Sequence, residues 1–309
     1  MELQHLKTFL SVADAGSLTR AAETLYLSQP AVSAQVKALE VELGLPLFRR
    51  AARGMELTAG GRELLDLARD VIHRADGITR MAERLRGDVT GTLRLGTTDC
   101  GYDLKLARMI GVTTDGHPDL DVRLVAGNSG QHVQGVLDHE LDLAIVEGDV
   151  DDERLQAWRI GTSRIGVIGP AAWRDDLADA GWARLGEFPW IFQSPTCSYC
   201  VLLNRLNAEH RLQLKPQIQA EAYGEVKSLV AEGLALSFAD LHDAAEWVED
   251  GRLFIWPHYA YDMPVQLIAS RSRTQEPAIA RFAEVAQKVH APTRRRKART
   301  AGSVNGSAE

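Results

Sequence analysis

The sequence predicts an α/β protein that begins with an all-α region, and three observations support this. Short amphipathic helical patterns fill residues 1–58, and an apolar seam with spacings of four and three follows over residues 59–87. From residue 91 to 290, short runs rich in Val, Ile and Leu alternate with helical stretches. We therefore expect an N-terminal helical domain, a long linker helix, an α/β domain and a disordered basic tail over residues 291–309.

Composition is that of an ordinary globular protein, with 45% apolar and 25% charged residues among 309. Neither a membrane-spanning run nor a signal peptide is apparent, and three cysteines do not form a disulfide framework, so we expect a cytoplasmic protein that does not contact membranes. The net charge of −7 does not exclude nucleic-acid binding, because a local basic patch decides that property.

The first three helices have clear start and stop signals. Leu3, Leu6 and Phe9 open an amphipathic helix that ends at Ala15-Gly16, and Ser17 is a good N-cap for the second helix. The third helix follows a short turn, with Ser28 as N-cap and Pro30 in the first turn, where its missing N–H has no cost. Two short helices joined by a tight turn predict a helix-turn-helix.

The third helix has two different faces. Its apolar stripe, at Val32, Val36, Leu39 and Leu43, predicts a core contact, whereas the opposite face is small, polar and slightly basic. Two short extended pieces then surround Arg53-Gly54 and predict a hairpin, or wing, with three clustered arginines.

This arrangement suits the major groove of double-stranded DNA. Gln29 and Ser33 can reach base edges, while Ser28, Lys37 and the wing arginines are placed for phosphates. A helical hairpin in an ordinary bundle would explain the apolar stripe but not the arginines. The DNA-facing set that we expect is Ser17, Thr19, Arg20, Ser28, Gln29, Pro30, Ser33, Lys37, Arg49, Arg50 and Arg53.

The linker helix carries a coiled-coil seam that calls for a partner helix. Its residues are Leu64, Ala68, Val71, Ala75, Ile78, Ala82 and Leu85, and Gly87 and Gly91 mark a hinge after it. The seam predicts a homodimer; a core helix within one chain is the alternative.

Residues 1–61 resemble the DNA-binding domain of the LysR-type transcriptional regulators. The resemblance rests on FLSVADAGSLTRAAETL, SQPAVSAQVKALE, LGLPLF and the wing pattern, all in register. It implies a winged helix-turn-helix, a dimerising linker helix and a two-lobed effector domain like a periplasmic binding protein. It further implies a promoter-binding activator or repressor under the control of a small-molecule effector, with RNA polymerase as a candidate partner and a tetramer as the favoured assembly.

On the family pattern, the first lobe comprises residues 91–165 and 266–290, and the second comprises residues 166–265. The runs TLRLGT, DVRLV, LDLAIV, RIGVIG, PWIF and VQLIA predict strands in mostly parallel sheets. A ligand between two such lobes lies at strand ends, near the amino ends of helices.

The loops after four of these strands supply the expected effector site. By resemblance, it comprises Thr97, Thr98, Asp99, Cys100, Asn128, Ser129, Glu147, Ser194, Thr196 and Cys197. Hydroxyl and amide groups suit a small polar metabolite, and the acids Asp99 and Glu147 indicate a cationic or amine-bearing one. Each of these residues could instead cap a helix.

Cys197 and Cys200 offer an alternative, a thiol- or metal-responsive regulator. They form C-x-x-C at a predicted helix start, where the helix dipole would lower a thiol pKa, and Cys100 lies in a loop expected to face them. Metal binding would need further ligands, for which His132 and Asp99 are candidates, so we commit to no metal site. Plain packing of small residues in a loop is the remaining interpretation.

No catalytic motif is present: the sequence lacks G-x-S-x-G, H-E-x-x-H and a phosphate-binding glycine loop. We therefore expect no enzyme, whether a thiol-disulfide oxidoreductase or another class, and no cofactor.

Overall fold

A computed structural model describes residues 1–51, 54–86, 89–98, 104–212, 214, 216–220 and 223–291. The predictions for Arg53, Gly87, Asp99, Cys100 and most of the basic tail concern residues outside this set.

The N-terminal region folds as its local signals predict. It contains α1 (Leu3–Ala15), α2 (Leu18–Leu25), α3 (Gln29–Leu43) and a hairpin of β1 (Phe48–Ala51) and β2 (Gly54–Leu57). The Ser17 hydroxyl accepts the Arg20 N–H at 3.4 Å, and the Ser28 hydroxyl accepts the Ala31 N–H at 3.3 Å, so both predicted N-caps are confirmed. Gly16 ends α1 with φ of 60°, a left-handed conformation that glycine adopts without strain.

The hairpin is fixed to the helices at two points. The Glu40 carboxylate of α3 accepts the N–H groups of Leu47 and Phe48 at 2.8 and 3.2 Å. On the other side, the Met55 N–H donates to the Gly16 carbonyl at 2.9 Å, and a Cβ at Gly54 would lie 2.3 Å from that oxygen. A side chain at position 54 would therefore force the wing away from the turn between α1 and α2.

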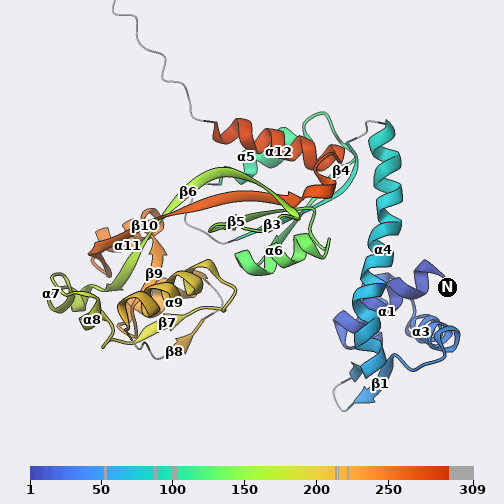
Figure 1. Cartoon of the computed structure of the whole chain (residues 1–309), viewed down its shortest axis with the longest axis horizontal. Coiled ribbons are helices and arrows are strands. Elements are labelled where there is room, and N and C mark those ends of the chain that lie inside the picture. The colour runs from blue at the N-terminus through green and yellow to red at the C-terminus, as the bar shows by residue number, and fades with distance from the viewer. Residues whose placement is uncertain are drawn as a thin grey trace, which may run out of the picture.

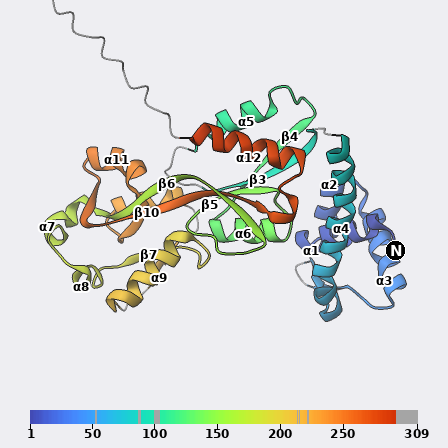
Figure 2. The ribbon, with the colours of Figure 1, turned by 45° about the horizontal axis from the view of Figure 1, so that its top comes forward.

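The linker α4 (Ala59–Arg86) is a single helix that stands beside the sheet domain in both views (Figures 1 and 2). Its first turns pack into the N-terminal core, where Ala68 is buried beside the half-buried Leu64 and Leu65. Further along, Val71 and Ile78 are 37% and 74% exposed. The seam is thus internal at its start and uncovered in a single chain beyond it.

The α/β domain is built on one six-stranded sheet, ordered β4-β3-β5-β10-β6-β9. These strands are β3 (Gly91–Thr97), β4 (Leu120–Ala126), β5 (Leu143–Glu147), β6 (Leu155–Pro170), β9 (Ser237–Asp240) and β10 (Leu253–Ser270). Only β3 pairs in parallel, with β4 and β5, whereas the pairs β10–β5, β10–β6 and β6–β9 are antiparallel. The prediction of mostly parallel sheets is therefore wrong for this sheet.

The error arises because β6 and β10 are long strands that run side by side through both halves of the domain (Figure 1). The predicted runs RIGVIG and VQLIA are only parts of them. We call the half with β3, β4 and β5 the first lobe and the half with β7 and β9 the second lobe.

In the first lobe, helices cover both faces of the sheet. Figure 1 shows α5 (Leu106–Thr114) and α12 (Pro277–His290) on one side and α6 (Ser129–Leu137) on the other. Buried residues of α12, such as Phe282, pack with Leu93, Leu143 and Leu267 of the strands.

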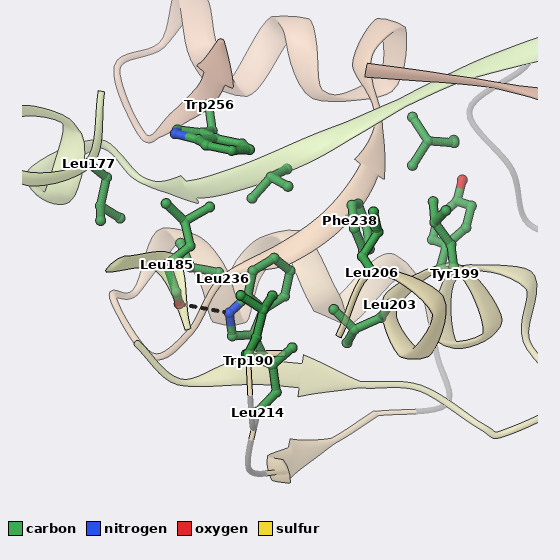
Figure 3. Packing of buried hydrophobic residues seen from close by; sticks show 14 of the residues in the cluster. Leu177, Leu185, Trp190, Tyr199, Leu203, Leu206, Leu214, Leu236, Phe238 and Trp256 are labelled. Atoms are coloured by element: carbon green, nitrogen blue, oxygen red, sulfur yellow. Dashed lines mark hydrogen bonds between the residues drawn. The ribbon is translucent and has the colours of Figure 1, made fainter. Parts of the chain in front are cut away.

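The second lobe packs helices around a small parallel sheet of β7 (Trp190–Phe192) and β8 (Pro216–Gln219) and around the far ends of β6 and β10. Its helices are α7 (Arg174–Leu177), α8 (Trp182–Leu185), α9 (Ser198–His210), α10 (Tyr223–Ala231) and α11 (Leu241–Glu249). Figure 3 shows its core, in which the fully buried Trp190 donates its indole N–H to the Leu185 carbonyl at 3.0 Å. Sequence reading missed the short strands β8 and β9.

Candidate nucleic-acid interface and ligand cleft

The outer face of α3 is free of contacts with the core. Gln29, Ser33 and Lys37 are exposed, whereas Val32 and Val36 on the opposite face are buried. Leu43, which we expected in the buried stripe, is 36% exposed at the end of the helix. The helix therefore presents a small, polar surface with one lysine.

The basic residues around α3 differ in how they are held. The Arg20 guanidinium donates to the Ala15 carbonyl, and Arg49 forms a 2.7 Å ion pair with Glu56 across the hairpin. Arg50 is exposed on β1, beside this pair. The Arg49 guanidinium is therefore held by Glu56, whereas Lys37 and Arg50 are exposed to solvent.

Tyr26 is a surface residue that sequence reading did not select. It caps α2 in a left-handed conformation, with φ of 54°, and is 96% exposed in the turn before α3. The left-handed backbone and the exposed ring mark Tyr26 as a candidate surface residue of the helix-turn-helix, and both features become visible only in the structure.

The two lobes of the sheet domain touch through a small set of polar groups. The Gly130 N–H of α6 donates to the Thr196 carbonyl at 3.0 Å, and the Thr196 hydroxyl donates to the Asn128 side chain at 3.0 Å. The Ser198 hydroxyl donates to the Glu147 carbonyl at 2.5 Å. A Cβ at Gly130 would lie 2.5 Å from two atoms of Thr196, so only glycine permits this approach.

Beside these contacts lies a cavity of about 470 Å³ with walls from both lobes. The carboxyl ends of β3, β4 and β5 form one wall, and the amino ends of α9 and α10 form the other. Its lining includes five of the residues that we expected in the effector site: Thr98, Asn128, Ser129, Glu147 and Cys197. The lining residues that sequence reading missed are Gln131, Gln193, Ser198, Tyr199 and Glu225, with Ala126, Gly127 and Gly224.

Two buried polar groups dominate this cavity. Glu147 is 7% exposed, and the Tyr199 hydroxyl donates to its Oε1 at 3.5 Å. Thr98 is 9% exposed, and its hydroxyl has no hydrogen-bond partner. A buried hydroxyl without a partner is costly, so it calls for an explanation.

The remaining expected residues either form hydrogen bonds within the protein or lie outside the lining of this cavity. Asn128 caps α6 in a capping box with Gln131, and the Ser129 hydroxyl accepts the Glu147 N–H at 3.0 Å. Thr196 lines a second cavity, of about 320 Å³, on the other side of the lobe contact. Thr97 and Ser194 lie outside both linings.

The cysteines do not have the environment that we predicted. Burial raises the pKa of the Cys197 thiol, and the nearby charge of Glu147 adds to this, so the expected lowering by the helix start is wrong. Burial also raises the pKa of Cys200. The Cys197 thiol donates to the Gln193 side-chain oxygen at 2.6 Å, which is the behaviour of a protonated thiol.

Of the two predicted metal helpers, Asp99 lies outside the described residues and His132 is buried, at 2% exposed. Burial lowers the pKa of His132, which favours the neutral imidazole that metals bind but brings no further ligand to it. Within the residues described, no three His, Cys, Asp or Glu side chains gather closely enough to hold a metal ion. The approach of Cys100 to the cleft stays a prediction, because that residue lies outside them.

Of the helices that the structure describes, none combines the length and the apolar character needed to span a membrane. A winged helix-turn-helix joined by one long helix to a two-lobed sheet domain defines a class, the DNA-binding regulators that carry a separate sensory domain.

Comparison with known proteins gives the family. The model "Bacterial regulatory helix-turn-helix protein, lysR family" matches residues 3–62, and the model "LysR substrate binding domain" matches residues 86–291. The chain is 38% identical to a probable RuBisCO transcriptional regulator of Synechocystis, over 82% of this chain and 76% of that protein. It is 30% identical to the RuBisCO operon transcriptional regulator of Allochromatium vinosum, over 82% of this chain and 84% of that protein.

Solved structures show the same fold. The crystal structure of CbnR, a LysR family transcriptional regulator, superposes with a TM-score of 0.62 at 22% identity, covering 94% of this chain and 99% of CbnR. The Vibrio cholerae virulence activator AphB superposes with a TM-score of 0.57 at 19% identity, covering 94% of this chain and 100% of AphB. The chain belongs to the LysR family of transcriptional regulators.

Proposed function

We propose that this regulator binds promoter DNA through the outer face of α3 and the β1–β2 wing, as a dimer joined along α4. The observation that carries the proposal is the exposed polar face of Gln29, Ser33 and Lys37, set opposite a buried apolar stripe. A helix of this kind fits the major groove with its first turns on base edges. We place this activity in the cytoplasm and attribute it to binding, without catalysis.

Substitutions on α3 test the proposal. Ser33→Ala and Gln29→Ala should each lower affinity for the specific site by about 1–3 kcal/mol and relax sequence preference, whereas Lys37→Ala should weaken binding to all sequences alike. Competition gel shifts with specific and random duplexes measure both effects. Equal loss on both duplexes in the Ser33 variant would exclude a base contact.

We further propose that a small effector binds in the 470 Å³ cavity and changes how the lobes meet. We take the lobes to be residues 91–165 with 266–290, and 166–265. A ligand that binds two lobe arrangements equally shifts neither, so the effector must prefer one of them. The contacts between Gly130, Thr196, Ser198 and Glu147 are the ones that such a ligand would stabilise or break.

A thiol sensor is the weaker candidate, since burial raises the pKa of both described thiols. Replacing Cys200, the cysteine of this pair that does not line the cavity, with Ser should leave the effector response of DNA binding unchanged, and peroxide should not alter wild-type binding. Loss of response in that variant, with a two-proton mass loss in the oxidised wild type, would instead establish a disulfide switch.

A further inference from the structure

The charge of the cleft selects the chemical class of its ligand. Resting on the proposed effector function, we propose that the effector presents an ammonium or guanidinium group to Glu147 and a hydrogen-bonding group to Thr98, and that phosphorylated or polycarboxylated metabolites are excluded.

The charged side chains among the described lining residues of the cavity are all acidic. Glu147 and Glu225 line the cavity, and no Lys, Arg or His is among its described lining residues. Residues 99–103 and 221–222, which flank lining residues and lie outside the described set, contain no Lys or Arg in the sequence either. An anionic group about 4 Å from the Glu147 carboxylate would lose roughly a thousandfold in affinity at an intermediate dielectric, and a cation would gain by the same interaction.

Helix amino ends also lie at the cavity, and their first-turn N–H groups favour anions, in opposition to the carboxylates. The first turn of α6 is already satisfied, because the Asn128 side chain accepts the Gln131 N–H at 3.0 Å within a capping box. At α9, the N-cap residue Cys197 donates its thiol proton to Gln193 and makes no capping hydrogen bond, so the first-turn N–H groups of this helix favour an anion. The full charges of Glu147 and Glu225 outweigh the partial charge at a helix amino end, which is about half an elementary charge.

Thr98 independently indicates a hydrogen-bonding group on the ligand. Its side chain lies in the cavity wall, is 9% exposed and has a hydroxyl without a partner, about as buried as the neighbouring Glu147. The Tyr199 hydroxyl holds the Glu147 carboxylate from the second lobe at 3.5 Å, so closure of the lobes orients that carboxylate. A ligand group that meets Thr98 would supply the hydrogen bond that the protein leaves unmade.

The test separates native metabolites by charge. A metabolite extract of the cells that express this protein is divided at pH 7 into fractions held by a cation exchanger, held by an anion exchanger and held by neither. Each fraction is titrated into the full-length protein on promoter DNA. We expect the cation-exchange fraction alone to change the gel shift.

Two matched variants connect the response to the cavity. Glu147→Gln should need roughly 10- to 100-fold more of that fraction, the usual effect of losing a charge-assisted hydrogen bond. Glu153→Gln, the same change at an exposed acid outside the cavity, should respond as wild type does. Thr98→Val should melt at a higher temperature without ligand and yet respond about tenfold more weakly.

Each result has a distinct meaning. A response confined to the anion-exchange or unbound fraction overturns the inference and leaves the effector function standing. No response to any fraction overturns the proposed effector function itself. A Glu147→Gln variant that melts normally and responds like wild type, or a Thr98→Val variant that melts lower without ligand, removes the assigned role of that residue.

Discussion

A methyl group at Gly130 should separate the two lobes. Gly130 lies in the first turn of α6, and a Cβ there would stand 2.5 Å from both the Cβ and the carbonyl oxygen of Thr196. Ordinary contacts of this kind are 3.4–4 Å, so Gly130→Ala requires a movement of about 1 Å between the lobes. The movement also stretches the 3.0 Å hydrogen bond from the backbone N–H of residue 130 to Thr196.

The expected magnitude follows from these two losses. Overpacking costs about 1–3 kcal/mol and a lost hydrogen bond about 1 kcal/mol, and both costs fall on the closed arrangement alone because α6 stays folded in either arrangement. At the lower end of this range, about 2 kcal/mol shifts the balance between closed and open lobes roughly 30-fold toward the open arrangement.

Hydrogen exchange measured by mass spectrometry reads this balance. Amides protected by the lobe contact exchange in proportion to the open population, so peptides covering residues 126–131 and 194–199 should exchange about 30-fold faster in the variant. Gly111→Ala is the matched control, because Gly111 lies within α5 with nothing within 4 Å of its added Cβ. That variant should gain about 0.5–1 kcal/mol in stability and exchange like wild type in both peptides.

Unchanged exchange in Gly130→Ala, together with a gain in stability like that of the control, would mean that the lobes do not meet at Gly130 in solution.

Two further predictions concern assembly and pH. Ile78 of the α4 seam is 74% exposed in one chain, so Ile78→Asp would place a charge in the dimer contact and should reduce the mass measured by light scattering to that of a monomer. Val41 of α3 is equally exposed, and the control Val41→Asp should leave the mass unchanged. Burial alone would raise the pKa of Asp142, but hydrogen bonds from Arg94 and the charge of Arg273 hold that pKa below its ordinary value. Since the carboxylate is favoured in the folded state, its contribution to the free energy of unfolding should be full above about pH 5 and should decline as pH falls below about 4. Urea titrations of Asp142→Asn should show a smaller decline at low pH and a loss of about 3–5 kcal/mol of stability at pH 7.

The N-terminal domain could be predicted almost to the residue because its signals are local. Ser17 and Ser28 act as caps through their own side chains, and Gly16 ends α1 through its own φ angle. Short-range rules of this kind need no knowledge of the rest of the chain.

The sheet could be predicted only in part, because strand direction depends on distant partners. The pairing of Val265 with Glu147 and Gly161 joins segments more than a hundred residues apart, and nothing in the local pattern shows that these pairs are antiparallel. The apolar runs located most of the strands but did not give their full length or their direction.

The candidate cleft was predicted in outline, through the loops after β3, β4 and β5. Tyr199, Ser198 and Gln193 were missed, because their meeting with Glu147 depends on how the second lobe closes over the first. The thiol pKa was mispredicted because the helix dipole was considered without the burial of Cys197, which has the larger effect.

A nuclease footprint of the full-length protein on the DNA upstream of its target gene shows whether two α3 helices bind DNA as a symmetric pair. We expect protection of two inverted half-sites, their centres about one helical turn or a multiple of it apart, and loss of that pattern in the Ser33→Ala variant at protein concentrations that saturate the wild-type site. Protection of a single half-site would contradict binding as a symmetric dimer. A Ser33→Ala footprint identical to that of the wild type would contradict a base contact by Ser33.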